Sequence, residues 1–219
     1  EVMEVVFQNQ GTLIKFIGDA VFVLWGAPIH CDDHASRACA TALLIQREVA
    51  RFNDTQRFPP LITRIGIASG PMVVGNLGSA RRFDYTAIGD TVNFASRIEG
   101  LNKYFGTKIL MSDTTRKEAA SAAPHVPMGL VQASGKREVT AIHAIFEEPL
   151  PEQTALTWQL ALLEYKRRAF DAATPLFTTI LTSEPRLATA AKLYLTSIEI
   201  FRTQPPGDEW QGEIRFAQK

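Results

Sequence analysis

The sequence predicts an α+β fold with a largely antiparallel sheet and flanking helices, followed by a small all-α extension. Short runs of alternating apolar and polar residues, bounded by turn residues, occur within the first 148 residues. Segments with helical periodicity are interspersed with these runs. From residue 154 to residue 201 only helical spacing is found. Strands joined by short turns and mixed with helices are typical of the α+β class.

Six segments have the alternation and the β-branched content of strands. We expect strands at residues 12–16, 20–25, 61–69, 72–75, 108–111 and 138–146. The first two segments flank Gly18-Asp19, and the third and fourth flank Gly70-Pro71. Because such dipeptides favour tight turns, each pair is expected to form a hairpin.

Helical periodicity before residue 148 is found in three segments, at 1–8, 33–52 and 91–104. The proline-containing stretch 149–151 then predicts a linker. Beyond it we expect two helices separated near Phe170, a third at 188–201 and an irregular tail. The aromatic and alanine spacing around Phe170 resembles one tetratricopeptide-type helical hairpin, although one unit does not establish a repeat array.

Composition excludes several classes of protein. The 219 residues carry no net charge, so no broad attraction to nucleic acid or an anionic membrane surface is expected. Two cysteines, Cys31 and Cys39, give no disulfide framework and are typical of a reducing compartment. No apolar run has the roughly 20 residues of a membrane span. We therefore expect a cytoplasmic location, either free or as the cytoplasmic part of a membrane-anchored protein.

The stretch KFIGDAVFVLWG at residues 15–26 places a lysine and an aspartate in an otherwise apolar hairpin. In an arbitrary hairpin, Gly18-Asp19 is simply a tight turn and Lys15 is a solvated strand residue. A carboxylate at a hairpin tip is also a suitable Mg²⁺ ligand, because it offers hard oxygen atoms and leaves room for water and phosphate.

A second stretch, RRFDYTAIGDTVNFASRIEG at residues 81–100, leads into the helix expected at 91–104, which Asp90 or Thr91 would cap. Asn93 and Arg97 lie four residues apart and share a face distinct from the apolar stripe. An amide and a guanidinium on one face suit a sugar and a polyphosphate, and a solvated polar face is the alternative.

Three long motifs together resemble the catalytic domain of class III nucleotidyl cyclases, of the bacterial adenylate cyclase type. They are KFIGDAVFVLWGAP, RIGIASGPMVVGNLGS and DYTAIGDTVNFASRIEGLNK, and they occur in the order and spacing of that family. The resemblance implies a ferredoxin-like class III cyclase fold at residues 1–148, then a linker at 149–153 and a helical extension at 154–219.

The resemblance also implies roles for individual residues. Asp19 matches the second metal-binding aspartate, and Lys15 matches the lysine that reads adenine. Thr86 matches the second purine-contacting position, while Asn93 and Arg97 match the pair that orients the ribose and stabilises the transition state. Lys136 is matched, on a weaker alignment, to the lysine that binds the terminal phosphates, since Ser-Gly-Lys stands where the family has Lys-Gly-Lys.

The implied reaction converts ATP to cyclic AMP and pyrophosphate with two Mg²⁺ or Mn²⁺ ions per site. In this family the site lies between two subunits, so the resemblance implies a homodimer. Asp19 would face one cleft, and Lys15, Thr86, Asn93, Arg97 and Lys136 would face the other.

One departure concerns the family's first metal aspartate, which lies on a strand upstream of the first helix. The sequence begins after that strand, with Glu1. We expect an internal segment of a longer polypeptide, with a sensor or a membrane anchor upstream.

Three other readings remain. A guanylate cyclase would use GTP, although Lys15 favours adenine. A degenerate cyclase serving as a regulatory or dimerisation module would do no chemistry. The cluster HCDDH at residues 30–34 could be a zinc site, but Asp32 or Asp33 as a helix cap is the expected reading.

Overall fold

The computed structural model describes residues 2–79, 82–119, 123–132 and 139–216. Within these ranges the helices are α1 (Val2–Gln8), α2 (His34–Asp54), α3 (Asp90–Phe105), α4 (Asp113–Glu118), α5 (Glu152–Lys166), α6 (Phe170–Ser183) and α7 (Ala188–Thr203). The strands are β1 (Thr12–Ile17), β2 (Ala20–Leu24), β3 (Ile65–Ile67), β4 (Val73–Ser79), β5 (Arg82–Ile88), β6 (Ile109–Ser112), β7 (His125–Gln132), β8 (Val139–Ile145) and β9 (Glu213–Arg215).

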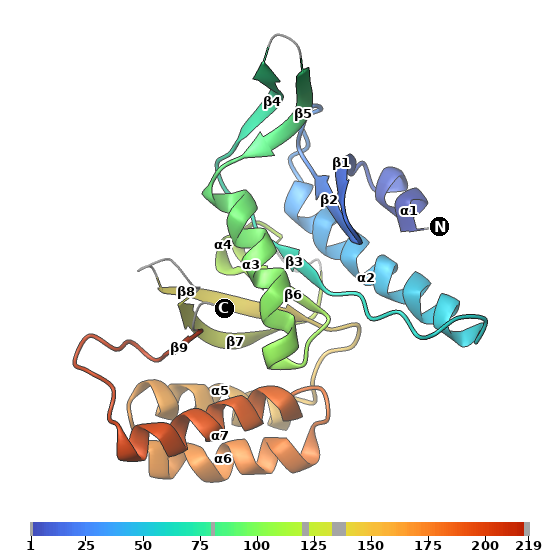
Figure 1. Cartoon of the computed structure of the whole chain (residues 1–219). Coiled ribbons are helices and arrows are strands. Elements are labelled where there is room, and N and C mark those ends of the chain that lie inside the picture. Colours follow the sequence, from blue (N-terminus) through green and yellow to red (C-terminus); the bar gives the residue numbers. More distant parts are fainter. Residues whose placement is uncertain (1, 80–81, 120–122, 133–138, 217–219) are drawn as a thin grey trace.

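The strands form one five-stranded sheet and two hairpins (Figure 1). The five-stranded sheet has the order β3-β6-β8-β7-β9, while β1 pairs with β2 and β4 pairs with β5. Among the described pairings, β3 with β6 and β7 with β9 are parallel, and the other four are antiparallel. The predicted α+β class with a largely antiparallel sheet is therefore confirmed, as is the succession of three C-terminal helices.

The predicted hairpin at residues 61–75 is wrong. Its first half contains β3, which pairs in parallel with β6, and its second half begins β4, which pairs with β5. Gly70 has a φ of 156°, which residues other than glycine rarely adopt. Pro71 has no backbone N–H to donate to a neighbouring strand. The chain therefore leaves the sheet at this point instead of reversing within it.

The C-terminal helices share a core with the sheet. Buried apolar residues from α3, β6, β7 and β8 form one continuous cluster with those of α5, α6 and α7. Figure 1 shows the three helices packed together below the sheet, and the chain then returns to add β9 beside β7. The predicted irregular tail therefore contains a strand. One apolar core extends across residues 149–153, and the domain boundary expected there stays a prediction.

Two hydrogen bonds fasten these helices to a bulge in β7. The register between β7 and β8 shifts between Pro127 and Gly129, so Met128 has no partner residue in β8. The indole Nε1 of Trp158 in α5 donates to the Pro127 carbonyl at 2.6 Å, and the hydroxyl of Tyr194 in α7 donates to the Met128 carbonyl at 2.7 Å. The buried carbonyl of Met128 and the partly buried carbonyl of Pro127 thus find their donors in the helical extension.

No helix in the described part of the chain combines the length and the apolar character needed to cross a membrane.

Candidate active site

The hairpin of β1 and β2 carries two of the predicted site residues. Lys15 lies in β1, half-buried, immediately after a register irregularity, and it is opposite Phe22. Asp19 is exposed in the turn that joins the strands, next to Gly18 with a φ of 62°. The predicted hairpin is confirmed. The turn leaves the carboxylate of Asp19 accessible, as a ligand for a solvated cation must be.

A third predicted residue, Thr86, lies in β5, half-buried and opposite Gly75 of β4. Strand β5 contacts β1 on one side and leads directly into α3. The two residues assigned to the base, Lys15 and Thr86, are therefore on neighbouring strands although 71 positions separate them in the sequence.

Helix α3 carries Asn93 and Arg97 in its first two turns. Asn93 is exposed and Arg97 is half-buried. The prediction that Asp90 or Thr91 caps α3 is wrong. Gly89 occupies the N-cap position, and glycine has no side chain to form a cap bond. The hydroxyl of Thr91 instead donates to the Pro71 carbonyl at 3.0 Å, which ties the start of α3 to the segment that precedes β4.

Helix α3 is held in place by two residues that were not among the predicted site residues. Gly66 in β3 lies so close to the helix that a Cβ atom there would be 2.3 Å from the Ala95 carbonyl oxygen and from the Glu99 nitrogen. Asn102 is fully buried, and its amide donates to the Ile65 carbonyl of β3 at 3.0 Å and accepts from Thr107 at 2.8 Å. A signal for Asn102 was present, since it is a polar residue beside the apolar stripe of a helix.

The structure thus places five of the six predicted residues on three units, the β1–β2 hairpin, β5 and the N-terminal half of α3, and β5 contacts both of the others (Figure 1). The sixth, Lys136, lies outside the described residues. This arrangement offers one carboxylate, two cationic groups, an amide and a hydroxyl, which is a set of groups suited to a phosphorylated and hydroxylated ligand.

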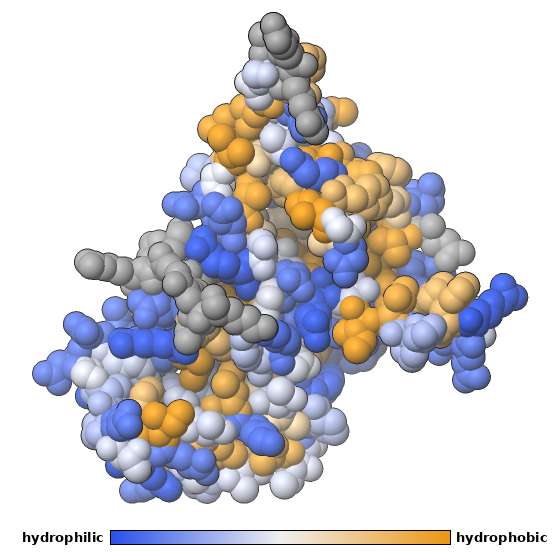
Figure 2. All heavy atoms as spheres, viewed as in Figure 1, coloured by the Kyte–Doolittle hydropathy of each residue, from blue (hydrophilic) through white to orange (hydrophobic). Residues whose placement is uncertain are grey.

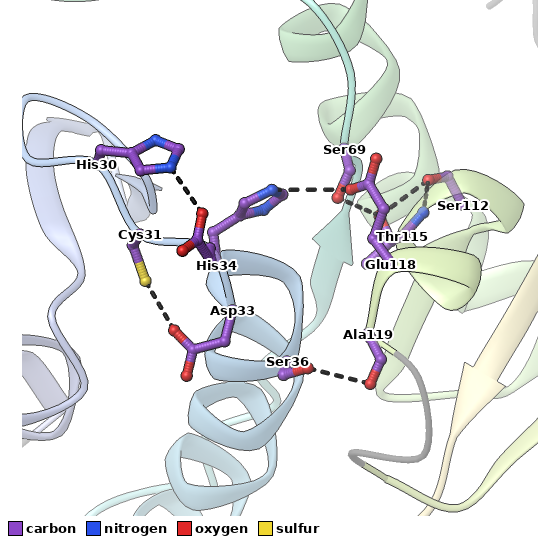
Figure 3. A network of polar contacts seen from close by, with 11 residues as sticks. His30, Cys31, Asp33, His34, Ser36, Ser69, Ser112, Thr115, Glu118 and Ala119 are labelled. Atoms are coloured by element: carbon purple, nitrogen blue, oxygen red, sulfur yellow. Dashed lines mark hydrogen bonds and ion pairs between the residues drawn. The ribbon is translucent and has the colours of Figure 1, made fainter.

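The HCDDH segment forms a different kind of network (Figure 3). Asp33 occupies the N-cap of α2 but makes no side-chain cap bond, so the expected capping contact is wrong. Its carboxylate accepts from Arg37 at 2.7 Å and from Cys31 at 3.0 Å. The bond from Arg37 holds the pKa of Asp33 down at about 2. His30 contacts Asp32, and His34 faces Glu118, 3.9 Å away in α4.

Metal-binding capacity is limited in the described part of the chain. No group of three or more histidine, cysteine, aspartate or glutamate side chains is placed to hold an ion there, including the HCDDH segment. Asp19 fits the chemistry of Mg²⁺ as a single ligand, because this ion is often held by one or two carboxylates together with phosphate oxygens and water. Asp19 alone does not make a complete metal site.

Comparison with known proteins agrees with this geometry. The chain is 41% identical over 145 residues to "Adenylate cyclase 1" of Rhizobium meliloti (strain 1021), a match that covers 65% of this chain and 22% of that protein. It is 33% identical over 145 residues to "Adenylate cyclase" of Anabaena cylindrica, covering 62% of this chain and 28% of that protein. The chain thus spans about a quarter of the length of these relatives.

Among solved structures, the crystal structure of the guanylyl cyclase Cya2 is similar, with a TM-score of 0.59 and 30% identity over 69% of this chain and 76% of that one. The family model of the adenylate and guanylate cyclase catalytic domain matches residues 2–143, which contain all the elements that carry the described site residues. The chain therefore belongs to the adenylate and guanylate cyclase catalytic domain family.

Proposed function

We propose that this chain converts ATP to 3′,5′-cyclic AMP and pyrophosphate. The observation that carries the proposal is the convergence of Lys15, Thr86 and the Asn93–Arg97 face on adjacent elements of a chain that belongs to the cyclase family. Two relatives of the matched region are named adenylate cyclases. The degenerate-module reading predicts no turnover, and the activity measurements below separate it from this proposal.

The substrate is bound at both of its ends in this proposal. Lys15 donates to a ring nitrogen of adenine, and Thr86 contacts the same base from the neighbouring strand. Asn93 orients the ribose, and Lys136 pairs with the terminal phosphates. Because an adenine ring offers acceptors where guanine offers N–H donors, a lysine at position 15 favours ATP.

The chemical step is an in-line displacement at the α-phosphorus. The ribose 3′-oxygen forms a bond to this atom while its proton passes to solvent, and the bond to the bridging oxygen of pyrophosphate breaks. Such a transfer depends on positioning and on neutralised charge. Arg97 meets the charge that develops on the α-phosphoryl oxygens, a contact whose removal typically costs about 10²–10³ in rate. Asp19 would hold Mg²⁺ or Mn²⁺, which neutralises phosphate charge and lowers the pKa of a coordinated hydroxyl.

The site is shared by two copies of the chain in this proposal, with Asp19 from one copy and the other residues from its mate. The exposed apolar surface supports this. Figure 2 shows apolar residues gathered in the upper half of the view, where Figure 1 places the β1–β2 and β4–β5 hairpins. The exposed large apolar residues on these strands are Phe16, Ile17, Val21, Val73, Phe83 and Ile88. A contiguous apolar surface of this kind is typical of an interface.

Complementation between two inactive variants tests both the reaction and the shared site. Asp19→Asn and Arg97→Ala are each expected to abolish turnover of ATP by the full-length protein. Random mixing makes half of the dimers mixed, and each mixed dimer has one intact site of two, so about a quarter of wild-type activity should return. Cyclic AMP formed from ATP is the measured product.

Mixing the Arg97→Ala protein with an Asn93→Ala protein is the matched control. Both residues serve the same side of the cleft, so this mixture should remain inactive. An Asp19→Asn and Arg97→Ala mixture that also stays inactive, while both variants still form dimers, would contradict a shared site.

Guanylate cyclase activity is the second candidate, favoured by the 30% identity to the guanylyl cyclase Cya2. Separate assays with ATP and with GTP decide between the two. A preference for GTP in the wild-type protein would overturn the assignment of Lys15 to adenine. A cytoplasmic location and an upstream sensor or membrane anchor belong to the same proposal. The greater length of the relatives leaves room for such an additional segment.

A further inference from the structure

Helix α5 has apolar residues on two faces. One face is buried against the sheet and its neighbouring helices through Trp158, Ala161 and Tyr165. The other face carries Leu156, Leu160 and Leu163, whose exposed fractions are 53%, 45% and 42%. Leucine side chains exposed to this extent in a continuous row are an unpartnered apolar surface, which we name the α5 leucine stripe.

The spacing of the α5 leucine stripe is that of a coiled-coil seam. Its members are separated by four and then three residues, and the same alternation continues to Gln153 at the start of the helix and to Arg167 just after its end. Two helices with such a seam pack side by side with their leucines interleaved. The geometry of the stripe thus specifies a helix as its partner.

The charges along α5 specify which helix. Glu152 begins α5 and Lys166 ends it, and neither side chain forms an ion pair within the described residues. When two copies of α5 lie antiparallel about a centre between Gln159 and Leu160, Glu152 is opposite the partner's Arg167 and next to the partner's Lys166. Leu156 then packs against the partner's Leu163. A parallel pair would leave Glu152 without a cationic side chain opposite it.

We propose that the α5 leucine stripe is an interface with a second copy of this chain, formed by antiparallel pairing of two α5 helices about a two-fold axis. Figure 1 places α5 at the opposite end of the molecule from the β1–β2 hairpin, which carries Lys15 and Asp19. The α5 contact is therefore separate from the proposed cyclase interface and does not depend on it. A chain with two different self-complementary surfaces assembles beyond the dimer.

Cysteine cross-linking in the 219-residue chain tests the pairing and its direction. Cys31→Ser removes the accessible native thiol, and Cys39 is buried. In this background the double variant Leu156→Cys, Leu163→Cys should form a disulfide-linked dimer under mild oxidation, while each single variant should not. Cross-linking of Leu156→Cys alone would indicate a parallel pair, and absence of cross-linking in the double variant would exclude the contact. Either result overturns the proposal.

Sedimentation analysis gives an independent measurement. Leu160→Glu places two carboxylates at the centre of the pair and should raise the dissociation constant of this contact at least about tenfold. Ile200→Glu is the matched control, because Ile200 in α7 is 52% exposed and lies off the stripe. Glu152→Lys should weaken association, and adding Lys166→Glu should restore it. Equal association of the Leu160→Glu and Ile200→Glu proteins would refute the interface.

Discussion

Replacing Tyr194 by phenylalanine tests whether the hydrogen bond from α7 to the bulge of β7 stabilises the fold. The Tyr194 side chain is fully buried, and its ring stacks on Phe177 with centroids 4.8 Å apart. Its hydroxyl donates to the carbonyl of Met128, the bulge residue that has no partner in β8. Phenylalanine keeps the ring packing and removes only the donor, so the variant isolates this one hydrogen bond.

The expected cost follows from leaving a buried carbonyl without its donor. Such a group lowers the free energy of unfolding by about 1–3 kcal/mol. For a chain of this size each kcal/mol lowers Tm by roughly 2–4 °C, so we expect a decrease of about 2–12 °C. Thermal unfolding followed by circular dichroism measures this decrease.

Tyr104→Phe is the matched control, because Tyr104 lies at the end of α3, is partly exposed and makes no hydroxyl hydrogen bond within the described residues. Its free energy of unfolding should change by no more than the ~0.5 kcal/mol typical of surface substitutions, so its Tm should shift by no more than about 2 °C. If Tyr194→Phe were equally harmless, the helical extension would not be satisfying the bulge of β7, and the reasoning would fail.

Three further predictions concern pH, the nucleotide and the support of α3. Burial lowers the pKa of His143 to about 4 from 6.5, so the folded state resists protonation. Stability should therefore be full above about pH 6.5 and fall by up to about 3 kcal/mol as the pH drops to 4; His143→Gln should flatten this slope in urea titrations. Lys15→Glu should lower the rate with ATP relative to that with GTP in initial-rate assays. Gly66→Ala should reduce the free energy of unfolding by at least about 1–3 kcal/mol, because its Cβ meets the backbone of α3, and an unchanged urea midpoint would contradict this.

The parts of the fold that could be predicted are those fixed by local pattern. The alternation on either side of Gly18-Asp19 predicted the β1–β2 hairpin, and the apolar stripe of Val92, Ala95, Ile98 and Leu101 predicted α3. The motifs on these elements were long enough to indicate the family, and the family match confirms it. The role of each site residue stays a prediction, since it depends on a bound nucleotide and a second subunit.

The parts that could not be predicted depend on contacts between distant segments. Strand β3 pairs with β6 more than forty residues later, and nothing in the local alternation distinguishes this parallel pairing from a hairpin with β4. Asp33 illustrates the same limit at the start of a helix. Its carboxylate was expected to cap α2, but it accepts hydrogen bonds from Arg37 and Cys31 instead. The positions of β1, β2 and α3 were predictable, whereas the strands β5 and β7 were missed and the partner of β3 was predicted wrongly.

Helix α3 connects the proposed site with the helical extension. Its first turns carry Asn93 and Arg97, and its C-cap Gly106 lies so close to α7 that a Cβ atom there would be 2.5 Å from Thr189. Phe216, just after β9, packs on the rings of Tyr104 and Phe105 at the same end. The 16 residues of α3 place its two ends about 24 Å apart at 1.5 Å per residue. Because the helix is continuous and Gly66 leaves it no room to bend toward β3, a change in the packing of α7 is expected to reach the site as a displacement of α3 as a whole.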